Sequence, residues 1–317
     1  MTKLDERQII KIFQRNFSGK KFVSEDVEVF RIGKSFGVIK TDTLVESTDV
    51  PPGMSPAQIA RKSIVASVSD FAAKGVRPLY CVVSVSLPRN YSKSKVLQLA
   101  SGLKNASREF GFRILGGDTN EGKELVISAT LFGLAKKIAR RAGAKAGDHI
   151  IVTGPFGRTS AGLKIVLHGK KASAGFKKLA KKAVFLPTPR LIFGVSAATY
   201  MTSAMDSSDG LSTTLNEMAK QSNKRFVITQ IPKDDRLDSF AKDNKLDLID
   251  LVFNGGEEYE IVATASPKDL NRIKKIARTK KIRLICIGRV QKGAGVFLQK
   301  KQKLVKIRDR GWLHFTN

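Results

Sequence analysis

Hydrophobic and polar residues follow each other along the chain with two periods, one typical of helices and one typical of strands. In the first half, apolar residues three and four apart predict helices at 6–17, 55–74 and 92–110. The second of these begins with a capping box at Ser55 and stops at Gly75. Alternating apolar residues predict strands in the same half, at 27–32, 36–45, 79–87, 113–115 and 125–134.

The second half repeats this mixture after a basic, glycine-bearing linker at 139–148. Helices are predicted at 160–167, 175–184, 190–200 and 211–221. Strands are predicted at 149–153, 226–231, 258–263, 283–287 and 295–298. Because helices and strands alternate in both halves, we expect an α/β (α+β) fold with two domains, at 1–140 and 141–317.

The composition is that of an ordinary globular protein. The chain has 317 residues, 42% of them hydrophobic and 27% charged, which suggests two domains at roughly 150 residues each. Cys81 and Cys286 are far apart and outside any C-x-x-C pair, so neither a disulfide framework nor a cysteine zinc site is expected. The apolar runs are too short to span a bilayer, and residues 1–17 lack the apolar centre of a signal peptide. We expect a cytoplasmic protein with no membrane partner.

The charge is the unusual feature of the composition. Lys and Arg number 57 against 28 Asp and Glu, which gives a net charge of +29. Two explanations stay open, a nucleic-acid partner and a lysine-rich solvated surface. The second is favoured, because the basic residues form short runs along the whole chain that alternate with apolar residues. Four tyrosines and one tryptophan also offer few platforms for stacking on bases.

The acidic residues are distributed differently from the basic ones. Several lie beside glycine, serine or threonine in turn-like contexts, in the segments 41–43, 69–70, 116–119, 206–210 and 255–258. Each has an ordinary structural explanation when taken alone, since Asp209 could cap a helix and Asp118 could form an Asx turn. Together, in a basic chain, they predict one convergent acidic pocket at the ends of strands. Such a pocket needs cations, and carboxylate oxygens suit Mg²⁺ with its nucleotide phosphates.

Several common catalytic signatures are absent from the sequence. It contains no G-x-x-x-x-G-K-[ST] phosphate loop and neither the catalytic-loop nor the D-F-G signature of protein kinases. Its three histidines are scattered, and Cys81 and Cys286 lie inside predicted strands, where we expect both to belong to the core. No covalent nucleophile is therefore expected. Direct phosphoryl transfer, catalysed by positioning and metal electrostatics, remains.

Six motifs occur in an order that resembles a known family. They are Thr41-Asp42-Thr43-Leu44-Val45, Ser67 to Gly75, Gly116-Gly117-Asp118-Thr119, Arg141 with Gly143 to Asp148, Asp206 to Leu211, and Gly256 to Ile261. In this order, over nearly the whole chain, they resemble the thiamine-monophosphate kinase family, within the superfamily of aminoimidazole-ribonucleotide synthetase. The segment 49–54 is similar to the archaeal branch.

The resemblance implies ATP-dependent phosphorylation of thiamine phosphate to thiamine diphosphate. It also implies a two-domain fold with an N-terminal mixed sheet, and a homodimer built through the N-terminal strands. By motif, several Mg²⁺ ions would be held by Asp26, Thr41, Asp42, Asp70, Asp118, Asp206 and Asp209. ATP would contact Gly117, Asp118, Arg141 and Ser208. The substrate would meet Asp49, Glu257 and Trp312, the last either stacking on it or covering the core.

Some positions depart from the family pattern. Glu25 precedes Asp26 where many members have a second aspartate, which changes the reach of that carboxylate. Lys40 stands where a small hydroxyl residue is common, and would either replace the charge of one metal ion or point outward. Asp49 stands in place of a histidine that contacts the substrate, and Thr214 in place of an aspartate.

Two alternatives remain open beside this reading. Another enzyme of the superfamily is possible, although selenophosphate synthetase requires a reactive cysteine near the N-terminus and a hydrogenase-maturation relative requires one at the C-terminus. Here the first cysteine is Cys81, inside a predicted strand, and the last residues, 313–317, contain none. The second alternative is a nucleic-acid-binding protein on the same scaffold, against which the intact acidic motifs argue.

Overall fold

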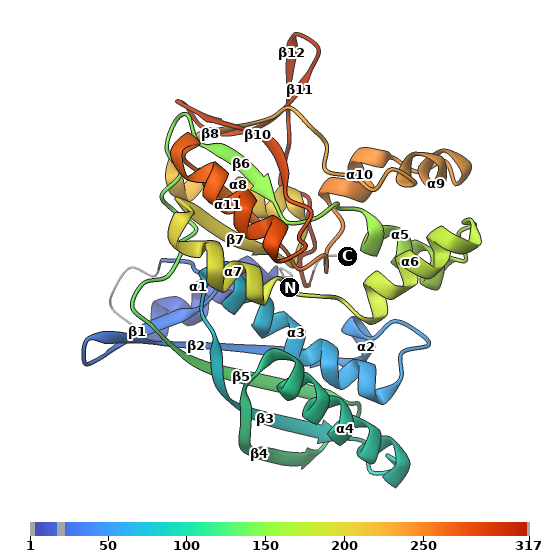
Figure 1. Ribbon diagram of the computed structural model, residues 1–317. Helices are drawn as coiled ribbons and strands as arrows, with labels where there is room; N and C mark the ends of the chain where they lie inside the picture. Colours follow the sequence, from blue (N-terminus) through green and yellow to red (C-terminus); the bar gives the residue numbers. More distant parts are fainter. Residues whose placement is uncertain (1–3, 18–22, 316–317) are drawn as a thin grey trace.

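Two β-sheets, one in each half of the chain, form the framework of the protein in this computed structural model, which describes residues 4–17 and 23–315 (Figure 1). The first sheet has five strands in the order β1-β2-β5-β3-β4. Its only parallel neighbours are β3 and β4, so it is mixed. The strands are β1 (Glu28–Ile32), β2 (Ser35–Val45), β3 (Pro78–Leu87), β4 (Arg113–Glu121) and β5 (Val126–Ala135).

Helices lie against one face of this first sheet. They are α2 (Glu46–Asp49), α3 (Pro56–Lys74) and α4 (Lys93–Phe110), while α1 (Glu6–Phe17) precedes the sheet in the chain. Side chains that point to the opposite face are exposed, among them Phe30, Tyr80, Val82 and Leu134. Among the described residues, the first sheet therefore has one packed face and one open face that carries large apolar groups.

The second sheet has seven strands in the order β12-β11-β8-β10-β6-β9-β7. They are β6 (His149–Val152), β7 (Ser203–Ser207), β8 (Arg225–Ile228), β9 (Glu260–Ala265), β10 (Ile285–Gln291), β11 (Gly295–Lys300) and β12 (Lys303–Lys306). Around it lie α5 (Arg158–His168), α6 (Ala174–Phe185), α7 (Leu191–Ala197) with η1 (Ala198–Tyr200), α8 (Leu211–Ser222), α9 (Leu237–Asp243), α10 (Leu248–Phe253) and α11 (Pro267–Thr279). No helix in the described residues is both long and apolar enough to cross a membrane.

Helix α3 lies between the two sheets and is buried on nearly all sides (Figure 1). It begins with a capping box between Ser55 and Gln58 and ends at Gly75, whose φ of 73° suits glycine. It packs against α4, β2 and β5 of the first half and against α7, β7 and β9 of the second. Its close approach to α7 requires Gly194, where a Cβ would lie 1.9 Å from the carbonyl oxygen of Ala72. One core of apolar residues from both halves therefore surrounds α3.

The structure confirms the predicted fold class and most of the predicted elements. The helices at 6–17, 55–74 and 92–110 are present, and Cys81 is buried as expected, whereas Cys286 is only half-buried. The prediction that 116–119 forms a turn after a short strand was wrong, because these residues continue β4. Elements without a prediction are α2, α9, α10, α11, β7 and β12.

Candidate functional site

Three buried carboxylates meet where α3 touches both sheets. Asp26 precedes β1, Asp70 lies in the last two turns of α3, and Asp206 lies in β7. One oxygen from each lies within 4.8 Å of the others. Each residue is at most 7% exposed. Residues separated by up to 180 positions in the sequence are thus brought together because α3 spans the junction of the two halves.

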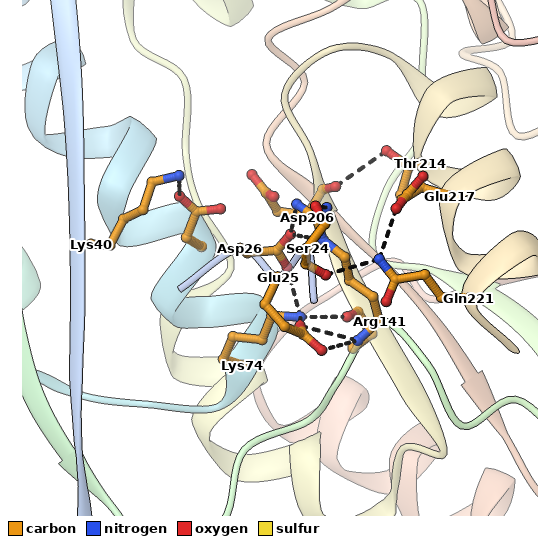
Figure 2. A network of polar contacts seen from close by, with 12 residues as sticks. Ser24, Glu25, Asp26, Lys40, Lys74, Arg141, Asp206, Thr214, Glu217 and Gln221 are labelled. Atoms are coloured by element: carbon orange, nitrogen blue, oxygen red, sulfur yellow. Dashed lines mark hydrogen bonds and ion pairs between the residues drawn. The ribbon is translucent and has the colours of Figure 1, made fainter. Parts of the chain in front are cut away.

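Two cations lie on one side of this group, as Figure 2 shows. The Lys74 ammonium, fully buried at the end of α3, is 2.8 Å from Asp26 Oδ2 and 2.7 Å from Glu25 Oε2. The Arg141 guanidinium lies 2.5 Å from Asp26 Oδ1. Burial acts to raise the pKa of Asp26, but the charges of Lys74 and Arg141 outweigh it and hold that pKa below its usual value.

A third cation, Lys40, lies on the other side of the group. Its Nζ is 2.8 Å from Asp70 Oδ2 and 3.3 Å from Asp42 Oδ1. Ser67 Oγ donates to the second oxygen of Asp42 at 2.7 Å. Lys40 and Asp42 are two residues apart in β2, so both side chains point toward α3. Thr41, between them, points to the open face, where it accepts a hydrogen bond from Thr130.

Two carboxylates of the acidic group have raised pKa values despite these cations. Burial and the neighbouring carboxylate of Asp26 raise the pKa of Asp206 to about 7. Burial, with Asp206 and Asp42 nearby, raises the pKa of Asp70 well above its usual value despite the opposing charge of Lys40. A compact set of oxygen ligands that resists ionisation fits a hard divalent cation such as Mg²⁺.

A cavity of about 590 Å³ opens beside Asp42, which Lys40 links to Asp70 of the acidic group. The end of β2, α2 and α3 form one wall, and α5 with the loops 208–209 and 256–259 forms the other. Six of the sequence-predicted residues line it, namely Asp42, Asp49, Ser208, Asp209, Glu257 and Trp312. The cavity therefore joins the predicted metal ligands to the predicted substrate contacts.

Lys62 of α3 fixes the floor of this cavity. Its side chain is 3% exposed, and its Nζ lies 2.5 Å from Glu257 Oε1 and donates to the carbonyl oxygen of Asp49 at 2.6 Å. Glu257 and Tyr259 have left-handed φ values of 63° and 52°, which non-glycine residues adopt where the surroundings enforce them. The Glu257 amide donates to the Ser208 carbonyl at 2.5 Å and contributes to that enforcement.

The C-terminal segment closes one rim of the cavity. The Trp312 amide donates to the carbonyl oxygen of Asp209 at 2.9 Å, and Asp309 accepts a hydrogen bond from Thr213. The Trp312 side chain is 59% exposed while it lines the cavity, so it does not cover the core. The exposed part of the indole can contact a ligand, while its ring lies edge-on to the ring of His314.

Comparison with known proteins agrees with this architecture. Residues 24–135 match the AIR synthase related protein, N-terminal domain, and residues 145–301 match the C-terminal domain of the same family. The thiamine-monophosphate kinase of Nitrosopumilus maritimus is 53% identical, over 99% of this chain and 100% of that protein. The chain belongs to the thiamine-monophosphate kinase family. The enzyme of this name from Pyrococcus horikoshii is 33% identical, over 99% of this chain and 97% of its own length.

The solved structures agree with this membership. A structure described as AaThiL complexed with AMPPCP and TMP superposes with a TM-score of 0.88 at 26% identity, covering 99% of this chain and 98% of that one. The two-domain arrangement of the thiamine-monophosphate kinase family is therefore the arrangement of this chain.

Not every site residue predicted from the family motifs lies near the acidic group. Gly117 and Asp118 lie in β4, the edge strand, in register with Val83 and Ser84 of β3. Asp118 is exposed, and β3 and β5 separate its strand from β2, which carries Asp42. Three predicted site residues therefore lie away from the acidic group within one chain, namely Thr41, Gly117 and Asp118.

Sequence reasoning missed two residues that shape the site of this kinase family member. Lys62 and Lys74 were overlooked because lysine is normally a surface residue. A signal was present, since both interrupt the apolar and small residues of 56–74, a helix with no polar face of its own. Lysine in such a helix indicates a carboxylate partner.

Proposed function

We propose that this protein transfers the γ-phosphoryl group of ATP to thiamine phosphate and so produces thiamine diphosphate and ADP. An oxygen of the substrate phosphate forms the new bond to the γ-phosphorus, and the bond from that phosphorus to the β–γ bridging oxygen breaks. The observation that carries the proposal is the 590 Å³ cavity lined by Asp42, which Lys40 links to Asp70 of the Asp26–Asp70–Asp206 group. AaThiL, bound to AMPPCP and TMP, has the same fold.

In this proposal the carboxylates hold Mg²⁺. Asp26, Asp70 and Asp206 are the central ligands, and Asp42 and Asp209 border the cavity from opposite walls. Bound Mg²⁺ neutralises phosphate charge, so that two anionic reactants can approach each other. The proposed ATP contacts of this chain are two residues. Arg141 lies beside Asp26, and Ser208 lies in the cavity wall.

In this reaction no residue of the chain has to remove a proton from the attacking phosphate oxygen. A phosphate oxygen is already ionised near neutral pH, so neither a covalent nucleophile nor a general base is required. The task of Asp49, Glu257 and Trp312 is to bind and orient the substrate. An exposed indole and an acidic side chain at one cavity suit a cationic ring.

We also propose that the open face of the first sheet pairs with a second copy, in a cytoplasmic homodimer. Phe30, Tyr80 and Val82 make this face apolar, which is unusual for a surface that stays in water. Asp118 lies beside Ser84 of that face, so any part it takes in metal or ATP binding would occur through the dimer. The proposed domain boundary remains at residues 140 and 141, within the segment between β5 and β6.

The direct test measures ADP release with Mg²⁺ and ATP, with thiamine phosphate or unphosphorylated thiamine as acceptor, and identifies the product by mass. Thiamine diphosphate should form from thiamine phosphate only. EDTA and the variant Asp70→Asn should abolish turnover. Asp243→Asn, an exposed carboxylate at the end of α9, is the matched control and should retain full activity. Tight ATP binding without turnover of thiamine phosphate would overturn the proposed substrate.

A further inference from the structure

We propose that the Lys40 ammonium takes the place of one divalent cation in the acidic group, so that the position between Asp42 and Asp70 is filled by the chain itself. The inference deepens the proposed function and rests on its metal site. In this inference the cluster holds two kinds of cation, an ammonium group and a metal ion. The Lys40 ammonium pairs with Asp42 and Asp70, and the metal ion binds among Asp26, Asp70 and Asp206.

The geometry around Lys40 is that of a bridging cation. A single Nζ contacts one oxygen from each of two carboxylates, at 2.8 Å from Asp70 and 3.3 Å from Asp42. A metal that bridged the same oxygens would lie between them at about 2.0–2.1 Å from each. The ammonium and the metal therefore compete for one volume, and only one of them can occupy it.

The backbone directs Lys40 into this volume. Lys40 lies in the interior of β2, where its partner in the register is Leu131 of β5. Alternation along the strand gives Lys40 the same direction as Asp42 and as the fully buried Val38. Ser67 of α3 holds the other oxygen of Asp42, which fixes that carboxylate in reach of the ammonium.

The charges of the cluster lead to the same assignment. Five carboxylates converge here, those of Glu25, Asp26, Asp42, Asp70 and Asp206. Four cations contact them, namely Lys40, Lys74, Arg141 and the half-exposed Arg140. Three of these pair with Glu25 or Asp26, whereas Lys40 pairs with Asp42 and Asp70. Without Lys40, Asp42 and Asp70 would lose the cation that they share, and a second divalent ion would be drawn in.

The test counts metal ions rather than turnover. Mn²⁺ replaces Mg²⁺ as the probe, and free Mn²⁺ is measured by electron paramagnetic resonance during titration of the ATP-free protein. Wild type is compared with Lys40→Ser, which removes the ammonium and opens the volume, and with Lys40→Met, which removes the charge but keeps the volume filled. Lys137→Ser, an exposed lysine, is the control for loss of one positive charge.

We expect Lys40→Ser to bind one more Mn²⁺ per chain than wild type, and Lys40→Met and Lys137→Ser to show no gain. An equal number of ions in wild type and Lys40→Ser would overturn the inference and leave the proposed metal site intact. Absence of Mn²⁺ binding by every protein would overturn both.

Thermal unfolding supplies a second readout if Lys40→Ser is unstable without metal. Removal of the ammonium leaves Asp42 and Asp70 facing each other, so the variant should melt below wild type in EDTA. Mn²⁺ should then raise its melting temperature by more than it raises that of wild type. Equal shifts in the two proteins would count against the inference.

Discussion

Lys62 Nζ lies 2.5 Å from Glu257 Oε1, so the central helix α3 and the loop after α10 are joined by an ion pair at the floor of the cavity. The lysine is buried, whereas the Glu257 side chain is 26% exposed and faces the cavity. One oxygen of Glu257 is therefore engaged by Lys62. Under the proposed function, the other carboxylate oxygen would face the substrate.

This pair predicts how substrate binding responds to substitution. Glu257→Gln keeps the shape but removes the negative charge that would attract a cationic ring. We expect the KM for thiamine phosphate to rise by about tenfold, equivalent to about 1.4 kcal/mol, with little change in the KM for ATP. Steady-state kinetics with each substrate varied in turn checks this. Asp243→Asn serves as the control, and an equal rise in both KM values would place Glu257 outside the substrate site.

Lys62→Met should act mainly on stability. The variant leaves Glu257 and the Asp49 carbonyl without the donor that they share, at a cost of about 1–3 kcal/mol. Chemical denaturation gives the free energy of unfolding directly. Lys104→Met, at an exposed position of α4, should cost less. Similar losses in both variants would contradict the assignment.

The raised pKa of Asp206 predicts a pH dependence of stability. The pKa of about 7 in the folded protein lies above the ordinary aspartate value of 3.8. The folded state therefore binds this proton more tightly. The stability it gives is complete below about pH 4 and is lost as the pH rises through about 7. Calorimetry of the metal-free protein should show Asp206→Asn gaining stability over wild type across that range. Parallel curves for the two proteins would show that Asp206 does not titrate there.

The open face of the first sheet predicts the oligomeric state. Val82→Glu places a charge in the middle of this face and should yield monomers in size-exclusion chromatography with light scattering. Val305→Glu in β12 is a matched control, because Val82 and Val305 are both 46% exposed. It should leave the mass unchanged. If Val82→Glu remains dimeric, the dimer contact lies on another surface of the protein.

The alternation along β2 separates two residues that share one motif. Asp42→Asn should weaken Mn²⁺ binding, because it removes a negative charge beside the acidic group and leaves Lys40 to pair with the metal ligand Asp70 alone. Thr41→Ala should leave Mn²⁺ binding unchanged, because Thr41 faces the other way. Titration with Mn²⁺ distinguishes the two variants. Equal weakening by both would mean that Thr41 reaches the metal through a second copy of the chain.

The spacing of apolar residues, together with the signals for helix starts and stops, was sufficient to predict most of the helices and strands. The capping box at Ser55 and the stop at Gly75 located α3 to the residue, since both signals act within a few positions of the helix ends. Strand β7 was missed because a buried five-residue strand that ends in Asp206 and Ser207 lacks both alternation and a long apolar run. The segment 116–119 was mistaken for a turn because its two glycines also occur in strands.

The site could be predicted only in part from the sequence, because a site depends on which strands are neighbours. Asp26, Asp70 and Asp206 were found because each belongs to a recognisable motif. Sequence does not show which strands are neighbours or which face a residue shares, so the separation of Asp118 from Asp42 required the sheet order. The direction of Lys40, which the sequence left open, was likewise decided by the pairing of β2 with β5.

The position of α3 has a consequence for how the protein unfolds. A helix that contributes to the packing of both sheets cannot lose its contacts with one half and keep a complete core in the other. The two halves should therefore melt in a single cooperative transition, although the chain contains two domains by sequence. Amide groups of α3 should exchange with solvent only through that global event, so the carboxylates it holds together stay assembled until the whole molecule opens.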